Sequence, residues 1–383
     1  MKIKACESIN EYISGIALIN NVFRIADGYE PTMQDEFPYL LSEDNMDRMF
    51  IAKQKDRTKS KFARKAVSVA SYLKNPMLIE GIEVMTASIG AVCTYEEYRG
   101  RELSSQVLDL LEENMKDDGV DICFVSGTRS LYTRRNFIEA LSMEKYSIPV
   151  KENDLNEMGI ELKDYKEEYL KDMLELYEQN PTRYLRTYDE FKTNIISRPF
   201  KWGILDYITK VIFRNGKITA YVIVQTIDKK DGVIIEAAGN KEDYIAAAQN
   251  IAFERNLETL IYEVHEKDTE NKLENCEAEL VPNRGTMKVV DYSSLMKKLK
   301  LYFIKNSEFG KSVKFSESDD KYSIEIDEEK ITVEGVADMS RLVLGKLDTE
   351  EFKSELESKK KIAEFVEKCF PIPLPFTENL NYQ

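Results

Sequence analysis

Residues 89–107 have the sequence Ile-Gly-Ala-Val-Cys-Thr-Tyr-Glu-Glu-Tyr-Arg-Gly-Arg-Glu-Leu-Ser-Ser-Gln-Val, and this stretch decides the fold. Residues 89–94 are apolar, small or β-branched, which is typical of a buried strand. A polar loop follows, in which an arginine stands on either side of Gly100. From Leu103 onward, apolar residues recur at helical spacing with charged residues between them. The stretch therefore predicts a strand, a basic loop and a helix, in that order.

This order of elements creates a place to hold an anion. The first N–H groups of a helix have no partner within the helix, and they carry the positive end of the helix dipole. Phosphate groups bind at such helix starts. The loop is not a Walker loop, because no Gly-Lys-Ser/Thr follows, and its glycine spacing does not fit a dinucleotide fingerprint.

The loop resembles motif A of the GNAT N-acetyltransferases, in which Arg/Gln-x-x-Gly-x-Gly/Ala holds the pyrophosphate of acetyl-coenzyme A. Arg99 takes the place of the Arg or Gln, and Ser104 stands where Gly or Ala is usual. Glu102 replaces the central glycine, so its charge and its side chain both oppose the pyrophosphate. The resemblance implies that acetyl-coenzyme A is held by Val92, Cys93, Thr94, Arg99, Gly100, Arg101, Glu102, Leu103, Ser104 and Ser126.

A second motif follows the next predicted strand, at residues 126–137. It is similar to a Leu-Tyr-x-x-x-Gly-Phe-like segment of acetyltransferases of the enhanced-intracellular-survival (Eis) type, whose tyrosine protonates the departing thiolate. Tyr132 takes the place of that tyrosine, and Phe137 that of the aromatic residue. Asn136 replaces the glycine and is expected to end a short helix in the left-handed region. The alternative is that Tyr132 only packs against the sheet.

Composition limits the classes of partner. The chain has 383 residues and a net charge of −15, so two or three domains are expected. The negative charge argues against nucleic acid or an anionic membrane as a partner. It is compatible with a cationic amine substrate, and also with a surface that only keeps the protein soluble.

Cysteine and histidine content indicate the compartment and exclude some sites. The five cysteines are scattered without a CxxC pair, which indicates free thiols in a cytoplasmic protein. The chain has no run of about 18 apolar residues and no signal-peptide core, so neither a membrane span nor secretion is expected. The single histidine, His265, excludes a His-rich metal site, and no metal is expected. His265 stands near the end of a predicted strand and is expected at the surface.

The remaining pattern predicts an α/β (α+β) fold with three parts. Residues 1–150 are expected to form a GNAT-like catalytic domain with the acetyl-coenzyme A motif, and Asn75-Pro76 within them is expected to form a turn. Residues 151–284 repeat the order of helix, hairpin, strand, helix and strand, which indicates a second GNAT-like domain without the cofactor motif. Its hairpin is signalled by Asn215-Gly216.

The third part, residues 285–383, resembles the sterol-carrier-like C-terminal domain of the same acetyltransferases. The segments that carry this resemblance are Gly285-Thr-Met-Lys-Val-Val-Asp291 and Leu342-Val-Leu-Gly345. Single helices are expected at 292–302 and 349–368. The proline-rich tail Phe370-Pro-Ile-Pro-Leu-Pro-Phe376 is expected to be extended.

The resemblance implies an N-acetyltransferase that moves an acetyl group from acetyl-coenzyme A to a primary amine of a small molecule, a lysine or a peptide. Tyr132 is then the general acid. Similar enzymes use the chain's own terminal carboxylate as the base, which here belongs to Gln383. The alternative for the tail is that it merely packs across domains. Glu96 and Glu97, close to the loop, are alternative bases. Similar enzymes are often multimers, so a homo-oligomer is one expected state.

A different class of function also fits the sequence. In this alternative the chain is a non-catalytic, acyltransferase-like protein that binds a ligand or a partner. Glu102 is the feature that favours it, because a carboxylate in a pyrophosphate loop repels the cofactor.

Overall fold

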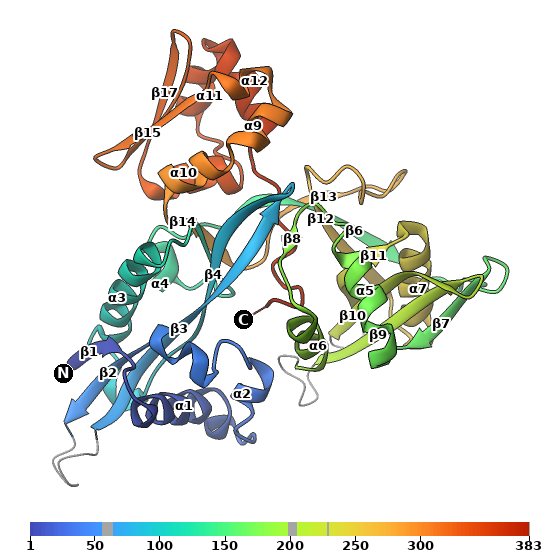
Figure 1. Ribbon diagram of the computed structural model, residues 1–383, viewed down its shortest axis with the longest axis horizontal. Helices are drawn as coiled ribbons and strands as arrows, with labels where there is room; N and C mark the ends of the chain where they lie inside the picture. Colours follow the sequence, from blue (N-terminus) through green and yellow to red (C-terminus); the bar gives the residue numbers. More distant parts are fainter. Residues whose placement is uncertain (56–63, 198–204, 228–229, 383) are drawn as a thin grey trace.

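The computed structural model describes residues 1–55, 64–197, 205–227 and 230–382, which form three β-sheets with flanking helices (Figure 1). The first sheet has the order β1-β2-β3-β4-β5-β14, with β8 paired to β3. Its strands are β1 (Lys2–Ala5), β2 (Met49–Lys55), β3 (Arg64–Ile79), β4 (Ile82–Thr94), β5 (Ile122–Val125), β8 (Arg183–Tyr184) and β14 (Thr286–Val289).

Helices cover both faces of the first sheet. Successive residues of a strand point to opposite faces, so Phe50 packs on the side of α3 while its neighbour Ile51 packs on the side of α1. Both side chains are fully buried. The helices of this part are α1 (Ile9–Phe23), α2 (Met33–Glu36), α3 (Leu103–Asp117) and α4 (Ser130–Thr133).

The turn predicted at Asn75-Pro76 is wrong, because β3 continues through both residues. Pro76 lies opposite Met85 of β4, whose backbone N–H and C=O bond to Asp121 on the other side. The Pro76–Met85 pair therefore makes no hydrogen bond between the strands. On its other side Pro76 faces the residue after β8, and its carbonyl accepts the backbone N–H of Leu185 at 2.8 Å, so the strand continues with only the N–H of the proline missing.

The second sheet has the order β13-β6-β12-β11-β10-β9-β7. The predicted hairpin at Asn215-Gly216 is confirmed, with φ values of 52° and 74°. The strands are β6 (Leu141–Pro149), β7 (Ile160–Asp164), β9 (Leu205–Arg214), β10 (Lys217–Ile227), β11 (Asp231–Gly239), β12 (Thr259–His265) and β13 (Glu279–Pro282). The helices are α5 (Leu170–Tyr177), α6 (Tyr188–Ile196) and α7 (Lys241–Glu254).

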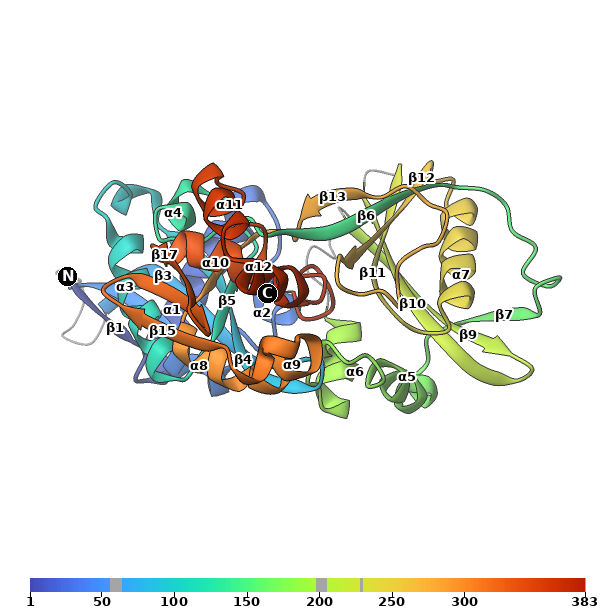
Figure 2. The ribbon, with the colours of Figure 1, turned by 90° about the horizontal axis from the view of Figure 1, so that it is seen from above.

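The third sheet is an antiparallel meander of β15 (Lys314–Ser318), β16 (Lys321–Ile326) and β17 (Glu329–Glu334). Together with its helices it lies over the first sheet (Figure 2). The prediction of single helices at 292–302 and 349–368 is wrong, since the chain breaks each into two. The helices are α8 (Tyr292–Lys298), α9 (Lys300–Asn306), α10 (Val336–Leu344), α11 (Glu350–Glu357) and α12 (Lys360–Cys369).

The sheets exchange strands across the predicted boundaries at residues 150 and 284. β6 precedes residue 150 but belongs to the second sheet, and β14 follows residue 284 but pairs with β5 of the first. Because strands pair across both predicted boundaries, the sheets alone do not mark the limits of the domains, and the division into three domains stays a prediction. In the part of the chain that the structure describes, no helix is long and apolar enough to cross a membrane.

Residues 370–382 form an irregular, largely buried tail that descends between the first two sheets (Figure 1). Thr377 donates a hydrogen bond to the backbone carbonyl of Arg284 at 2.6 Å, and Glu378 pairs with the Arg284 guanidinium at 2.9 Å. The tail also covers the end of β12. The expectation that His265 lies at the surface is therefore wrong, because its side chain is buried.

A buried ion pair holds the end of the tail. Both terminal nitrogens of Arg186 donate to the Glu236 carboxylate, at 2.8 and 2.7 Å, and the Nε donates to Asn381 at 2.6 Å. Tyr221 donates to the same carboxylate at 2.9 Å. Breaking such a pair leaves an uncompensated charge in the interior.

We predict that Arg186→Leu lowers the free energy of unfolding by about 3–5 kcal/mol, because it leaves Glu236 buried without its cation. Chemical denaturation followed by circular dichroism measures the change. The control is Lys171→Ala, which breaks the exposed pair with Glu175 and should have no measurable effect. Equal stability of the two variants would contradict the assigned role of the buried pair.

Candidate functional site

The site begins where β4 and β5 stop pairing. The two parallel strands pair only from Thr86–Ile122 to Ile89–Val125, yet β4 continues to Thr94. Ala91 has φ = 56° and lies at a register shift against β3, which bends the end of the strand. Among the described residues, no strand pairs with residues 90–94 on the side of β5. A backbone edge with free polar groups is therefore left beside the basic loop.

A cleft of about 1030 Å³ lies at this edge. It brings together nine of the ten predicted cofactor-binding residues, namely Val92, Cys93, Thr94, Arg99, Gly100, Arg101, Glu102, Leu103 and Ser104. The opposite wall comes from the end of α1 and the residues after it. The other lining residues are Val22, Phe23, Arg24, Asp27, Tyr29, Tyr98, Arg129 and Leu131.

The loop keeps a glycine-like backbone although it carries a glutamate. Glu102 is the N-cap of α3 and has φ = 56° and ψ = 18°, in the left-handed region that glycine favours. Its side chain is exposed and makes no capping hydrogen bond to the first turn of α3. The first amides of the helix thus remain available for a ligand.

Positive charge gathers in the cleft of an acidic protein. Arg99, Arg101 and Arg129 all line it, and no ion pair between described residues involves any of them. Arg101 instead donates to the backbone carbonyl of Glu97 at 3.0 Å. These three guanidinium groups outnumber the nearby carboxylates of Asp27 and Glu102. The cleft therefore suits an anionic ligand.

Arg129 and the contribution of α1 were not predicted from the sequence. Arg129 stands four residues after the end of β5, at the same edge of the sheet as the basic loop. Since parallel neighbouring strands bring their carboxyl ends together, its position after a predicted strand was the available signal. No comparable signal marked the residues after α1, because their contact with the loop depends on tertiary packing.

Cys93 lines the cleft, but its thiol is not a reactive group. Burial raises the pKa of its thiol well above the usual range, against a smaller opposing effect of Arg99. The thiol is therefore neutral at physiological pH and is a poor nucleophile.

Tyr132 lies behind the cleft rather than in its lining. Its side chain is 7% exposed and packs edge-on against Phe137, with ring centroids 6.1 Å apart. Burial raises the pKa of Tyr132, so the phenol stays protonated at neutral pH. The predicted left-handed residue after α4 is confirmed, since Asn136 has φ = 66°.

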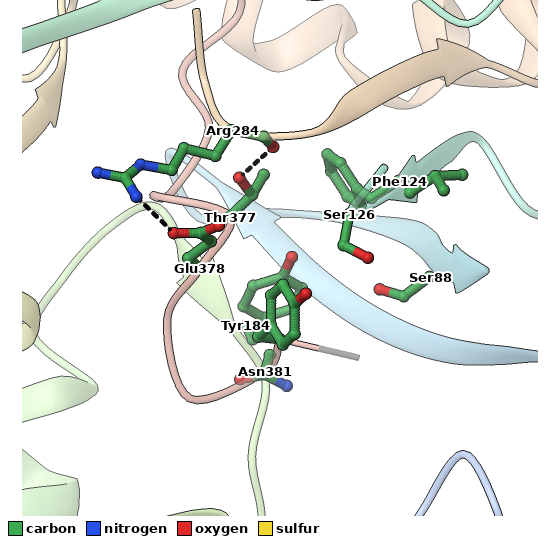
Figure 3. A pocket seen from close by; sticks show the side chains of 10 residues that line it. Ser88, Phe124, Ser126, Tyr184, Arg284, Thr377, Glu378 and Asn381 are labelled. Atoms are coloured by element: carbon green, nitrogen blue, oxygen red, sulfur yellow. Dashed lines mark hydrogen bonds and ion pairs between the residues drawn. The ribbon is translucent and has the colours of Figure 1, made fainter. Parts of the chain in front are cut away.

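Ser126 lies in a separate small hollow, lined by Ser88, Phe124 and the tail (Figure 3). Tyr382 of the tail lines the same hollow. The tail thus reaches the carboxyl end of β5, next to the point where the strands diverge. Gln383, the predicted source of the base, lies outside the described residues. The alternative bases Glu96 and Glu97 are exposed and do not line the cleft.

Comparison with known proteins identifies the first part of the chain. Residues 8–139 match a family described as "Acetyltransferase (GNAT) domain". These residues thus carry the sequence pattern of a GNAT acetyltransferase domain, and they include the residues that line the cleft described above. No curated protein sequence matches the chain.

The full-length fold is that of Eis-like acetyltransferases. The chain is similar to a GCN5-related N-acetyltransferase from Kribbella flavida, with a TM-score of 0.62, 13% identity and all of both chains covered. For Eis1 from Mycobacterium abscessus the TM-score is 0.60 at 12% identity, covering 99% of this chain and 100% of that one. For a probable N-acyltransferase from Enterococcus faecalis V583, the TM-score is 0.62 and the sequence identity is 12%. The match covers 97% of this chain and 97% of that one. The predicted fold class and the resemblance to the Eis type are confirmed.

We predict that Glu102→Gly is more stable than Glu102→Ala by up to about 1 kcal/mol. A residue with a Cβ pays about 1–2 kcal/mol in the left-handed region, whereas glycine loses only about 0.5–1 kcal/mol of additional chain entropy. Both substitutions remove the same charge, so each is the other's control. Chemical denaturation measures the difference, and a more stable alanine variant would show that the loop does not hold this backbone conformation.

Proposed function

We propose that this chain transfers an acetyl group from acetyl-coenzyme A to a primary amine of a small molecule, a lysine or a peptide. The observation that carries the proposal is the cleft of the GNAT domain. It combines the uncapped start of α3 with three arginines that form no ion pair with a carboxylate of the described residues. Both features favour a ligand with several negative charges at one end.

The phosphates of the cofactor are proposed to bind at the basic loop. Backbone N–H groups of residues 103–105 at the start of α3 point along the helix axis and suit the diphosphate oxygens. Arg99 and Arg129 add charge-assisted hydrogen bonds from two sides of the cleft. Glu102 opposes this attraction, but its exposed side chain leaves the backbone path open.

The free edge of β4 is proposed to hold the thioester. As the amine attacks, the acyl oxygen becomes negative, and a fixed N–H donor lowers the energy of that charge. The backbone of Val92, Cys93 and Thr94 lines the cleft on the side where β5 has diverged. A donor from this edge needs no rearrangement during the reaction.

Tyr132 is proposed to protonate the coenzyme A thiolate as it leaves. A thiol with a pKa of ~8.5 departs better when a nearby acid supplies a proton. The raised pKa of the Tyr132 phenol keeps that proton available at neutral pH. Its flanking residues Arg129 and Leu131 already line the cleft, and catalytic contacts often tighten only when the substrate is bound.

The terminal carboxylate of Gln383 is proposed as the base. An alkylammonium with a pKa of ~10.4 is almost fully protonated at neutral pH and must lose a proton before it attacks. Asn381 is fixed by Arg186, and Tyr382 lines the same hollow as Ser126 at the end of β5. Because the described end of the tail is anchored near the diverging strands, a carboxylate one residue further along would be positioned there at a low entropic cost.

Glu102 also supports a second candidate, a ligand-binding protein of the same fold without chemistry. One negative charge about 4 Å from a phosphate opposes binding by about 1 kcal/mol even in water. Cofactor binding and turnover must therefore be measured separately.

We predict that Glu102→Gln binds acetyl-coenzyme A about fivefold more tightly, because it removes that repulsion and keeps the side-chain size. Isothermal titration calorimetry measures the dissociation constant. The control is Glu113→Gln, an exposed change further along α3 that should not alter it. Absence of binding to both the native chain and the variant would reject the cofactor assignment.

We predict that Tyr132→Phe lowers kcat by about 10²-fold with little change in cofactor affinity, because only the proton donor is lost. Steady-state assays of thiol release with a panel of amines measure kcat, and calorimetry measures affinity. Tyr98→Phe is the control, since Tyr98 lines the cleft but has no proposed chemical task. Equal effects of the two changes would remove Tyr132 from the mechanism.

A chain extended by one C-terminal glycine should also lose turnover, since it displaces the carboxylate of Gln383 from its proposed place. The residues before it and their contacts are unchanged. An extended chain with native kcat and an unshifted pH profile would assign the base elsewhere.

A further inference from the structure

A second cavity lies in the second sheet, where β11 and β12 separate. These parallel strands pair only over Asp231–Thr259 to Val233–Ile261, and both continue beyond that point. The space between residues 234–237 and 262–265 is a cavity of about 470 Å³. Residues 373–376 of the tail line its other side. It is formed by a different sheet from the arginine-lined cleft.

Two buried polar atoms of this lining have no partner within the protein as described. They are Oε2 of Glu263 and Nε2 of His265, whose residues are 6% and 4% exposed. The other atom of each group is satisfied. Oε1 of Glu263 accepts from Arg284 at 3.0 Å, and Nδ1 of His265 accepts the backbone N–H of Lys267 at 3.1 Å.

The hydrogen-bonding role of each atom follows from these contacts. Because Nδ1 of His265 accepts a hydrogen bond, the neutral imidazole carries its proton on Nε2, which is therefore a donor. Burial lowers the pKa of His265 to about 3, so the ring is neutral at physiological pH. Oε2 of Glu263 is an acceptor. The two unpartnered atoms are thus one donor and one acceptor.

The two groups also lie on the same face of one strand. Residues two apart in a strand point in the same direction, with Cα atoms about 6.6 Å apart. A small polar group that forms one hydrogen bond of about 2.9 Å to each residue can bridge a distance of this size. A buried polar atom without a hydrogen-bond partner costs about 1–3 kcal/mol. A bound molecule that forms a hydrogen bond with each of the two atoms therefore removes this cost twice.

We propose that this cavity binds a neutral small molecule through an amide group, whose carbonyl accepts from His265 Nε2–H and whose N–H donates to Glu263 Oε2. Tyr177, Ile235 and Phe376 also line the cavity and provide an apolar wall for the rest of the molecule. The site is separate from the proposed acetyl transfer and does not depend on it.

Charge distinguishes an amide from the two simplest alternatives. A carboxylate ligand would accept from His265 but would face the Glu263 oxygen with a second negative charge. An ammonium ligand would suit Glu263 but would leave the N–H of His265 pointing at a cation. Only a group with both roles satisfies the pair.

The test compares three probes of one shape on the full chain: benzamide, benzoate and benzylamine. Isothermal titration calorimetry at neutral pH measures each dissociation constant. Benzamide should bind at least tenfold more tightly than the other two. Equal affinities, or no binding of benzamide, would overturn the proposal, and the latter result would mean that only water satisfies the two atoms.

Variants then assign the binding to this cavity. Glu263→Gln keeps an oxygen for Arg284 but replaces the acceptor with an N–H donor, so the preference should change from benzamide to benzoate. The matched control is Glu266→Gln. Glu266 is adjacent and also has a buried oxygen without a partner, but it does not line the cavity. Identical probe preferences in the two variants would contradict the site, and the measurement on the native chain decides if Glu263→Gln does not fold.

Discussion

The divergence of β4 from β5 beyond Ile89 and Val125 is the constraint on which the functional architecture depends. Two parallel strands that stay paired would leave no backbone edge for a thioester and no room for a cleft. The bend at Ala91 separates them, and the basic loop and α3 then follow at the open end. A coenzyme A ester needs this combination, because its phosphates and its acyl group require different partners at a fixed separation.

Much of this first site could be predicted from the sequence, because it is local. A strand, a loop and a helix in sequence order bring Val92 to Ser104 together without any distant contact. At two positions the backbone has the conformation that the family motifs require, although the residue type differs from the motif. Glu102 and Asn136 both occupy the left-handed region at places where the resembling motifs carry glycine. The fold thus preserves a conformation that the composition of the loop alone would not indicate.

What the sequence could not predict depends on contacts between distant segments. His265 has a surface-like position at the end of a strand, but its side chain is buried, and the returning tail lines the same cavity. Pro76 would end a strand in most contexts, but here the distant segment of β8 lies beside it, and Leu185 donates a hydrogen bond to its carbonyl. The placement of Tyr132 behind the cleft rather than in its lining also depends on packing, since its motif gives only its position in the chain.

The central claim is that the start of α3 holds a diphosphate although Glu102 stands in the loop. A crystal structure of the chain with coenzyme A tests it most directly. The account predicts diphosphate oxygens within hydrogen-bonding distance of the backbone N–H groups of residues 103–105, with Arg99 beside them and the Glu102 carboxylate directed to solvent. Coenzyme A bound elsewhere, or a Glu102 carboxylate that itself accepts those hydrogen bonds, would contradict it.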